Sequence, residues 1–198
     1  MTSRRIRSGE RDAVLATVVE AFRTDPQLRW YFPDDAGYDA GAPRFFGVLL
    51  DTRIEGGEVW AVDDLSAVAL WIPPGGNLLG PDAVEARYAE AVATLPAPAP
   101  ERIAVTDRLV DGLLPQRPHW YLGVLATRPE RRGRGLASAV LAPVLAAADR
   151  AGVPVALETS TARNVAYYGR HGFATLGEQA LGPDSPTVRV MQREPLPR

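Results

Sequence analysis

Apolar residues recur along the chain at two spacings, and these spacings predict where helices and strands lie. Repeats of three and four residues, typical of one helix face, predict helices at 9–22 and 39–54. Two further helices are predicted between 82 and 114, on either side of a proline-alanine linker. Residues 24–35 contain two prolines, so no long helix is predicted there. The first part of the chain is therefore expected to be rich in helices.

Continuous apolar runs predict strands, and two of these runs frame a loop and a helix. Residues 58–62 and 66–72 are predicted to form a hairpin. Residues 119–127 and 154–160 have the composition of strands buried on both faces, with a helix from about 133 to 150 between them. This order predicts a parallel strand-helix-strand unit. Shorter strands are predicted at 4–7, 173–179 and 187–193.

Composition narrows the class of protein. A chain of 198 residues, 46% of them hydrophobic, is expected to form a single domain over 1–198. The net charge of -2 argues against a nucleic-acid partner. Cysteine is absent and histidine occurs only as His119 and His171, so thiolate zinc sites and cysteine nucleophiles are excluded and no metal is expected. Because no signal peptide or long apolar window is present, we expect a soluble cytoplasmic protein with no membrane partner.

The loop between the two buried strands has the features of a phosphate site. Residues 132–137 stand at the start of the predicted helix, where several backbone N–H groups are free and the helix dipole favours an anion. Gly133 and Gly135 let the backbone approach a ligand closely. Arg132 and Arg134 add positive charge.

Three other interpretations of this loop stay open on the sequence alone. A nucleic-acid patch would need a broader basic surface than this acidic chain offers. A dinucleotide loop would use the two glycines together with Glu158, which lies where a ribose-binding acid would stand. In the third interpretation the arginines merely keep a turn soluble.

Two motifs in this region resemble a known family. The segment "RGRGLA", residues 132–137, is similar to the pyrophosphate signature (Q/R)-x-x-G-x-(G/A) of the GNAT superfamily of N-acetyltransferases. Its defined positions are occupied by Arg132, Gly135 and Ala137. Downstream, "ARNVAYYGRHGF" matches the family's next helix and its Gly-Phe pair through Asn164, Tyr168, Gly172 and Phe173. Over about its second two thirds, the chain is most similar to the puromycin N-acetyltransferase branch.

The resemblance implies a fold and a co-substrate. The implied fold is α/β, with a GNAT-like mixed, mostly antiparallel sheet, a splayed parallel central strand pair and flanking helices. Acetyl-CoA would lie in the gap between the splayed strands, without a metal. A backbone N–H near Leu125 would polarise the thioester carbonyl. The implied acetyl-CoA-binding residues are Leu125, Thr127, Arg132, Gly133, Arg134, Gly135, Leu136, Ala137, Asn164 and Tyr168.

The resemblance also implies direct attack by an amine in a ternary complex. Tyr168 would protonate the leaving thiolate, since a phenol with a pKa of about 10 holds its proton at neutral pH. Strand 119–127 lacks the glutamate that the family often uses as base, and Glu158 is the nearest replacement. Core packing for Tyr168 and a structural ion pair or hydrogen bond for Glu158 remain alternatives. His119 or a water relay could also supply the base.

The acceptor pocket is expected to come from residues 25–50 and 77–118. Its candidate aromatic residues are Trp30, Tyr31, Phe32, Phe45, Phe46 and Trp71, and its candidate acids are Asp25, Asp34, Asp35 and Asp51. The same residues would equally suit a core and a solvated surface. The expected substrate is a small-molecule primary amine, with an aminonucleoside or other antibiotic as candidates, bound by a monomer or homodimer. A protein acetyltransferase and a non-catalytic acyl-CoA sensor are the alternatives.

Overall fold

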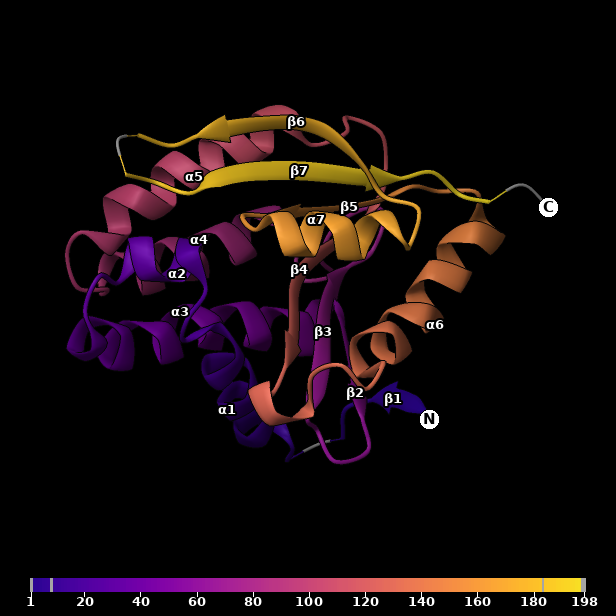
Figure 1. Cartoon of the computed structure of the whole chain (residues 1–198), viewed down its shortest axis with the longest axis horizontal. Coiled ribbons are helices and arrows are strands. Elements are labelled where there is room, and N and C mark those ends of the chain that lie inside the picture. Colours follow the sequence, from indigo (N-terminus) through magenta and orange to yellow (C-terminus); the bar gives the residue numbers. More distant parts are fainter. Residues whose placement is uncertain (1, 8, 183, 197–198) are drawn as a thin grey trace.

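A seven-stranded mixed sheet forms the centre of the molecule. The computed structural model describes residues 2–7, 9–182 and 184–196. The strands lie in the order β1-β2-β3-β4-β5-β7-β6 (Figure 1), and every neighbouring pair is antiparallel except β4 and β5. They are β1 (Ser3–Arg5), β2 (Glu58–Val62), β3 (Ala67–Ile72), β4 (Trp120–Thr127), β5 (Val155–Thr159), β6 (Ala174–Ala180) and β7 (Thr187–Arg193). The predicted mixed α/β sheet with one parallel central pair is confirmed.

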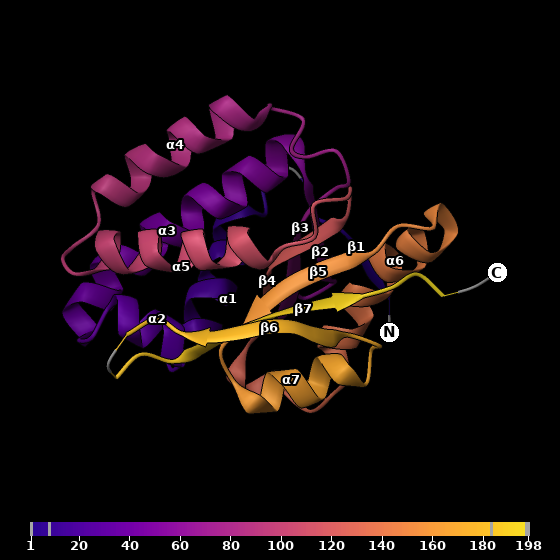
Figure 2. The ribbon, with the colours of Figure 1, turned by 90° about the horizontal axis from the view of Figure 1, so that it is seen from above.

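Helices cover both faces of this sheet. They are α1 (Arg11–Phe22), α2 (Pro26–Tyr31), α3 (Asp35–Gly56), α4 (Pro81–Ala93), α5 (Ala99–Leu113), α6 (Leu136–Ala151) and α7 (Ala162–Gly169). Figure 2 shows α3, α4 and α5 on one side of the sheet and α7 on the other. One core lies between the sheet and α1 to α3, and a second lies under α6. In the described residues, no helix has the length and apolar character needed to span a membrane.

Two helices in the first part of the chain begin at aspartate caps. The helix predicted from residue 39 begins at Asp35, because the Asp34 carboxylate accepts a hydrogen bond from the Gly37 N–H at 2.7 Å. Asp25 accepts hydrogen bonds from the N–H groups of Gln27 and Leu28 and starts α2, which has only six residues. Asp34 was expected to attract substrate, and its carboxylate instead serves the helix start.

The central strands β4 and β5 separate after a short paired stretch. They pair from Trp120 to Leu122 against Val155 to Leu157. The register between β3 and β4 shifts at Gly123, since Trp71 lies opposite Leu122 and Leu70 opposite Val124. This bulge changes the packing of β4, because Leu122 lies in the core under α6 and Val124 in the core under α1 to α3. The expected splay is confirmed, and it opens a gap beside the second half of β4.

Candidate active site

A cavity of about 940 Å³ lies between the helices α2 to α5 and the splayed ends of β4 and β5. A volume of this order is typical of small-molecule sites. Both segments expected to build the acceptor pocket contribute to its wall, through Tyr31 and Phe45 from the first and Tyr88 from the second. Glu158 and Tyr168 also line the cavity, so the two predicted catalytic residues share one space.

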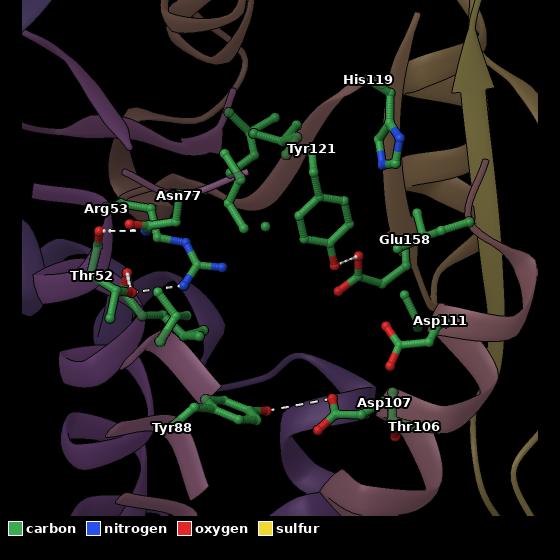
Figure 3. Close-up of a pocket in the computed structure, with 18 of the residues that line it drawn as sticks. Thr52, Arg53, Asn77, Tyr88, Thr106, Asp107, Asp111, His119, Tyr121 and Glu158 are labelled. Carbon is green, nitrogen blue, oxygen red and sulfur yellow. Dashed lines mark hydrogen bonds between the residues drawn. The ribbon is translucent and has the colours of Figure 1, made fainter. Parts of the chain in front are cut away.

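Glu158 and Tyr121 form a hydrogen-bonded pair at the mouth of the strand gap (Figure 3), with the Tyr121 hydroxyl donating to the Glu158 carboxylate. Burial raises the pKa of Glu158 to about 7, and the hydrogen bond from Tyr121 opposes that rise. Burial and the neighbouring Glu158 hold the pKa of Tyr121 well above its usual range. Glu158 therefore exchanges a proton near neutral pH, which suits a general base. The partner of Glu158 was not predicted, because Tyr121 looks in the sequence like any residue of a buried strand.

Two further carboxyl groups project from α5 into the cavity. Asp107 accepts a hydrogen bond from the Tyr88 hydroxyl at 3.4 Å, and burial raises the pKa of Asp107 to about 6. Asp111 stands one turn further along the same helix face (Figure 3). Sequence reasoning missed both residues. Their spacing of four within a predicted helix was the available signal.

Most of the acids first expected in the pocket serve structural roles instead. Asp35 pairs with Arg29 at 3.0 Å, and Asp51 pairs with Arg11 at 2.6 Å. Together with the cap at Asp34, these contacts place three of the four predicted acids outside the cavity wall. Asp25 lines the cavity while capping α2.

The expected aromatic residues divide in a similar way. The cavity wall includes Tyr31, Phe45 and Phe46. Phe32 packs in the core against Tyr38, and Trp71 packs against Trp120 at a ring-centroid distance of 6.4 Å. Trp30 lies against the Arg102 guanidinium, 5.1 Å from its ring centroid. Other side chains of the protein already cover the rings of Trp30, Phe32 and Trp71. These three residues therefore serve packing.

Tyr168 and its neighbour Tyr167 occupy different environments. Tyr168 is buried on α7, lines the cavity and packs against Phe173 at a centroid distance of 5.7 Å. The Tyr168 hydroxyl makes no hydrogen bond to any residue that the structure describes. Burial raises the pKa of Tyr168 above the usual value of a phenol. Tyr167 instead shares a hydrogen bond of 3.2 Å with Ser138 on α6. Of the two tyrosines, only Tyr168 is placed to meet a ligand in this cavity.

The glycine-containing loop before α6 leaves backbone donors free. Gly133 and Gly135 have φ values of +77° and +76°, and Gly135 starts α6 without a side-chain cap. Counting from the start of α6, Ala139 is the first residue whose N–H is hydrogen-bonded; it donates to Gly135 O. Leu136 and Ala137 therefore present free N–H groups to an anion. The exposed loop thus has the geometry expected of a pyrophosphate cradle.

The Arg132 side chain has a structural role beside this loop. Its guanidinium donates to the Ala21 carbonyl at 2.8 Å and to the Thr127 carbonyl at 3.3 Å. These bonds tie the loop to the end of α1 and to the end of β4. Arg134 is exposed and extends from the same turn. The charge of Arg132 is thus kept next to the free N–H groups by contacts with the protein.

The second half of β4 directs main-chain groups into the strand gap. The Arg128 N–H donates to Ser66 O, on the β3 side of β4. Because main-chain groups alternate along a strand, those of Leu125 and Thr127 face away from β3, toward the gap. Asn164, in the first turn of α7, lines the cavity near this gap. The second half of β4 thus has one side that pairs with no strand and faces the gap.

Comparison with known proteins identifies the same region. The model of the Acetyltransferase (GNAT) family matches residues 102–173, which run from α5 through the loop and α6 to α7. An uncharacterised N-acetyltransferase of Schizosaccharomyces pombe is 24% identical, in an alignment that covers 98% of this chain and 84% of that protein.

Solved structures share the fold over nearly the whole chain. One is described as histone acetyltransferase HPA2 and related acetyltransferase from Corynebacterium glutamicum, with a TM-score of 0.70 and 22% identity, covering 100% of this chain and 97% of that one. Arylalkylamine N-acetyltransferase 2 from Aedes aegypti has a TM-score of 0.65 and 15% identity, covering 97% of both chains. The chain therefore has the GNAT fold, and residues 102–173 match the model of that family.

Proposed function

We propose that this protein transfers the acetyl group of acetyl-CoA to a primary amine of a small molecule. The observation that carries the proposal is the continuity of two spaces. The gap between β4 and β5, which lies next to the free N–H groups at the start of α6, opens into the cavity that holds Glu158 and Tyr168. A thioester bound along the gap would therefore meet an amine bound in the cavity.

The chain's own groups suit the binding of that co-substrate. The Arg132 N–H already donates to Pro129 O at 3.3 Å, so the N–H groups at 133–137 would bind the pyrophosphate. The main chain of Leu125 and Thr127 would pair with the pantetheine arm. When bound, acetyl-CoA supplies an activated acyl group with a thiolate as leaving group. A backbone N–H near Leu125 would stabilise the negative charge on the thioester oxygen.

Two side chains would handle the protons of the transfer. Glu158 takes a proton from the amine as the nitrogen bonds to the acetyl carbon, since its raised pKa keeps it half ionised near neutral pH. Tyr168, protonated at that pH, donates its proton to the sulfur as the carbon–sulfur bond breaks. The amine attacks in its neutral form, so a cationic acceptor first releases one proton to solvent. In the transfer one further proton leaves the nitrogen and one reaches the thiolate, and the products are an amide and free CoA.

The shape of the cavity supports a small acceptor rather than a protein. Its aromatic wall, with Tyr31, Phe45 and Phe46, suits a compact or aromatic amine, and Asp107 and Asp111 suit a cationic one. The Aedes aegypti structure of similar fold is, by its name, an arylalkylamine N-acetyltransferase. Arylalkylamines and aminonucleosides, puromycin among them, are the acceptors to try first.

The proposal is tested by mixing the purified protein with acetyl-CoA and a panel of amines. The panel contains arylalkylamines, alkyl diamines, aminonucleosides, amino carboxylates and a lysine peptide, and the readout is thiol release confirmed by the mass of the acetylated product. Turnover of at least one small amine is expected. Exclusive turnover of the peptide would indicate a protein acetyltransferase, and acetyl-CoA binding without turnover would indicate a sensor.

A further inference from the structure

Arg53, near the end of α3, carries a buried positive charge without an anionic partner. The residue is 7% exposed, and its Nη1 donates to the Thr52 hydroxyl at 2.9 Å. Its Nε is buried without an acceptor. No carboxylate of the described residues forms an ion pair with it. Burial lowers the pKa of Arg53, but an arginine stays protonated in proteins, so the charge remains.

A second buried arginine shows how this protein pairs such a charge when its role is structural. Arg193 on β7 is 5% exposed, and both its terminal nitrogens donate to the Asp149 carboxylate, at 2.7 and 2.9 Å. A buried charge is costly unless it is paired and hydrogen-bonded. Arg193 meets that condition within the chain, whereas Arg53 does not. The missing partner of Arg53 is therefore expected from outside the chain.

The guanidinium of Arg53 faces the acceptor cavity. Arg53 belongs to the cavity wall, and Figure 3 shows its guanidinium directed toward Tyr121. Its Nη2 lies 3.4 Å from the position that a Cβ atom would take at Gly123. Gly123, the bulged residue of β4, thus leaves this side of the strand open for the guanidinium. Because Nε is buried and Nη1 donates to Thr52, Nη2 is the donor that faces a ligand in the same space as Glu158.

The cavity therefore has walls of opposite charge. Glu158, Asp107 and Asp111 form one wall, and Arg53 lies across the cavity from them, with the Tyr121 ring between Arg53 and Glu158 (Figure 3). If the amino group of a substrate lies at Glu158, the other end of the substrate lies across the cavity, near Arg53. A planar guanidinium with free donors matches a carboxylate, which accepts two parallel hydrogen bonds.

We propose that Arg53 binds a carboxylate of the acceptor, so the preferred substrates are amines that also carry a carboxylate, separated from the nitrogen by a carbon spacer. This inference rests on the proposed acetyl transfer to small amines. It adds a second recognition point and makes the acceptor a zwitterion rather than a simple cation.

The first experiment compares matched acceptors with the wild-type protein. The acceptors are amino carboxylates of increasing spacer length: glycine, β-alanine, γ-aminobutyrate and longer homologues. Each is compared with its primary amide and with the alkylamine of the same length. Phosphoethanolamine is included to test whether a phosphate replaces the carboxylate. At the best spacer, kcat/KM for the carboxylate is expected to exceed that for the amide by about 10- to 100-fold, the range of a charge-assisted hydrogen bond. A phosphate preference or equal rates would overturn the carboxylate assignment.

Variants then test whether Arg53 is responsible. Arg53→Gln should bring the carboxylate-to-amide ratio close to one, and Arg53→Lys should keep part of the preference. Arg87→Gln is the matched control, because Arg87 forms an exposed pair with Glu55 at 2.8 Å and should leave the ratio unchanged. If Arg53→Gln lowers kcat/KM for every amine equally, Arg53 does not recognise the carboxylate and the proposal is wrong. Should that variant fail to fold, the wild-type series and Arg53→Lys still decide.

Calorimetry separates this inference from the proposed function. The best amino carboxylate and its amide are titrated into the protein without acetyl-CoA, so binding is measured independently of turnover. Tighter binding of the carboxylate, lost in Arg53→Gln, supports the site even if no acetylation occurs. Acetylation without any carboxylate preference would overturn the role of Arg53 and leave the acetyltransferase proposal standing.

Discussion

At the residue scale, the proposed base Glu158, a half-buried carboxyl group, is predicted to set how the reaction depends on pH. Only the ionised carboxylate accepts a proton, so the contribution of Glu158 should rise through its pKa of about 7 and fall about tenfold per unit below it. Glu158→Gln should lower kcat/KM by about 10²- to 10⁴-fold above that pH. The ratio of wild-type to Glu158→Gln rates is the quantity to plot, because ionisation of the amine substrate cancels in it.

The matched control for this change is Glu90→Gln, on the exposed surface of α4. It should leave both the rate and the pH profile unaltered. A wild-type to Glu158→Gln ratio that is flat with pH would assign the base to another group, with His119 as the next residue to change, since it also lines the cavity.

Tyr121 is predicted to act through Glu158 as a positioning residue. Its hydroxyl donates to the ionised carboxylate and so holds the pKa of Glu158 below the value that burial alone would give. Tyr121→Phe should therefore move the midpoint of the pH profile upward, with full activity recovered at higher pH. A lower rate with an unchanged midpoint would mean that Tyr121 contributes only packing.

The two adjacent tyrosines of α7 offer a paired test of the general acid. Tyr168→Phe should lower kcat by about 10²- to 10⁴-fold and leave the Kd for acetyl-CoA nearly unchanged, because only the proton donor is lost. Tyr167→Phe removes a hydrogen bond to Ser138 outside the cavity wall and should cost about 1 kcal/mol of stability with kcat retained. Single-turnover kinetics and calorimetry give the two quantities. Equal effects of the two changes would argue for a packing role of Tyr168.

At the element scale, the loop before α6 depends on glycine for its backbone shape. A Cβ atom at Gly135 would meet nothing within 4 Å, but its φ of +76° is strained for any other residue. Gly135→Ala should therefore cost about 1–2 kcal/mol of stability through the backbone alone. It should also weaken acetyl-CoA binding, since the free N–H groups of the first turn would be reoriented.

Gly112 on α5 is the matched control, because a Cβ atom there also meets nothing within 4 Å and its φ is not positive. Gly112→Ala should stabilise the protein by about 0.5–1 kcal/mol. Urea unfolding measures both changes. Opposite signs of the two effects are expected, and a stable Gly135→Ala variant with unchanged acetyl-CoA affinity would remove the loop from the binding site.

The element boundaries show what local sequence can and cannot predict. Apolar spacing predicted the hairpin and the strand-loop-helix-strand unit, because a continuous apolar run bounded by turn residues is compatible with few structures other than a buried strand. The start of α3 was misplaced by four residues, because Asp34 looks equally like a ligand-binding acid and a helix cap until the Gly37 N–H is seen beside it. Short polar residues at helix starts are therefore poor candidates for a site.

At the scale of the whole molecule, the loop and the acceptor wall differ in how predictable they are. Residues 132–137 would bind a phosphate through backbone geometry that is local in sequence, so a sequence motif can represent them. Arg53, Asp107 and Glu158 come from α3, α5 and β5, and they meet only because two helices cross the splayed end of the sheet. Each residue alone resembles a surface charge. Their burial, which determines their chemistry, is a property of the assembled fold.

From the splayed sheet we also predict how the thermal stability of the whole molecule should change when acetyl-CoA binds. The strands β1 to β4 join β5 to β7 through a parallel pairing that ends at Leu122 and Leu157, so a ligand bound in the gap would contact both parts of the sheet. Acetyl-CoA that binds only the folded state, at about 100 times its Kd, should stabilise the protein by about 2.7 kcal/mol. For a chain of this size, that corresponds to a rise in Tm of about 5–10 °C.

Scanning calorimetry with acetyl-CoA, and with ATP at the same concentration, tests this response. ATP offers phosphates to the N–H groups before α6 but has no arm to occupy the gap, so its effect on Tm should be clearly smaller. Gly135→Ala should reduce the response to both ligands, because both require the same backbone donors. An equal shift with ATP would mean that the gap contributes nothing to binding, and the path from the loop to Glu158 would then have to lie elsewhere in the cavity.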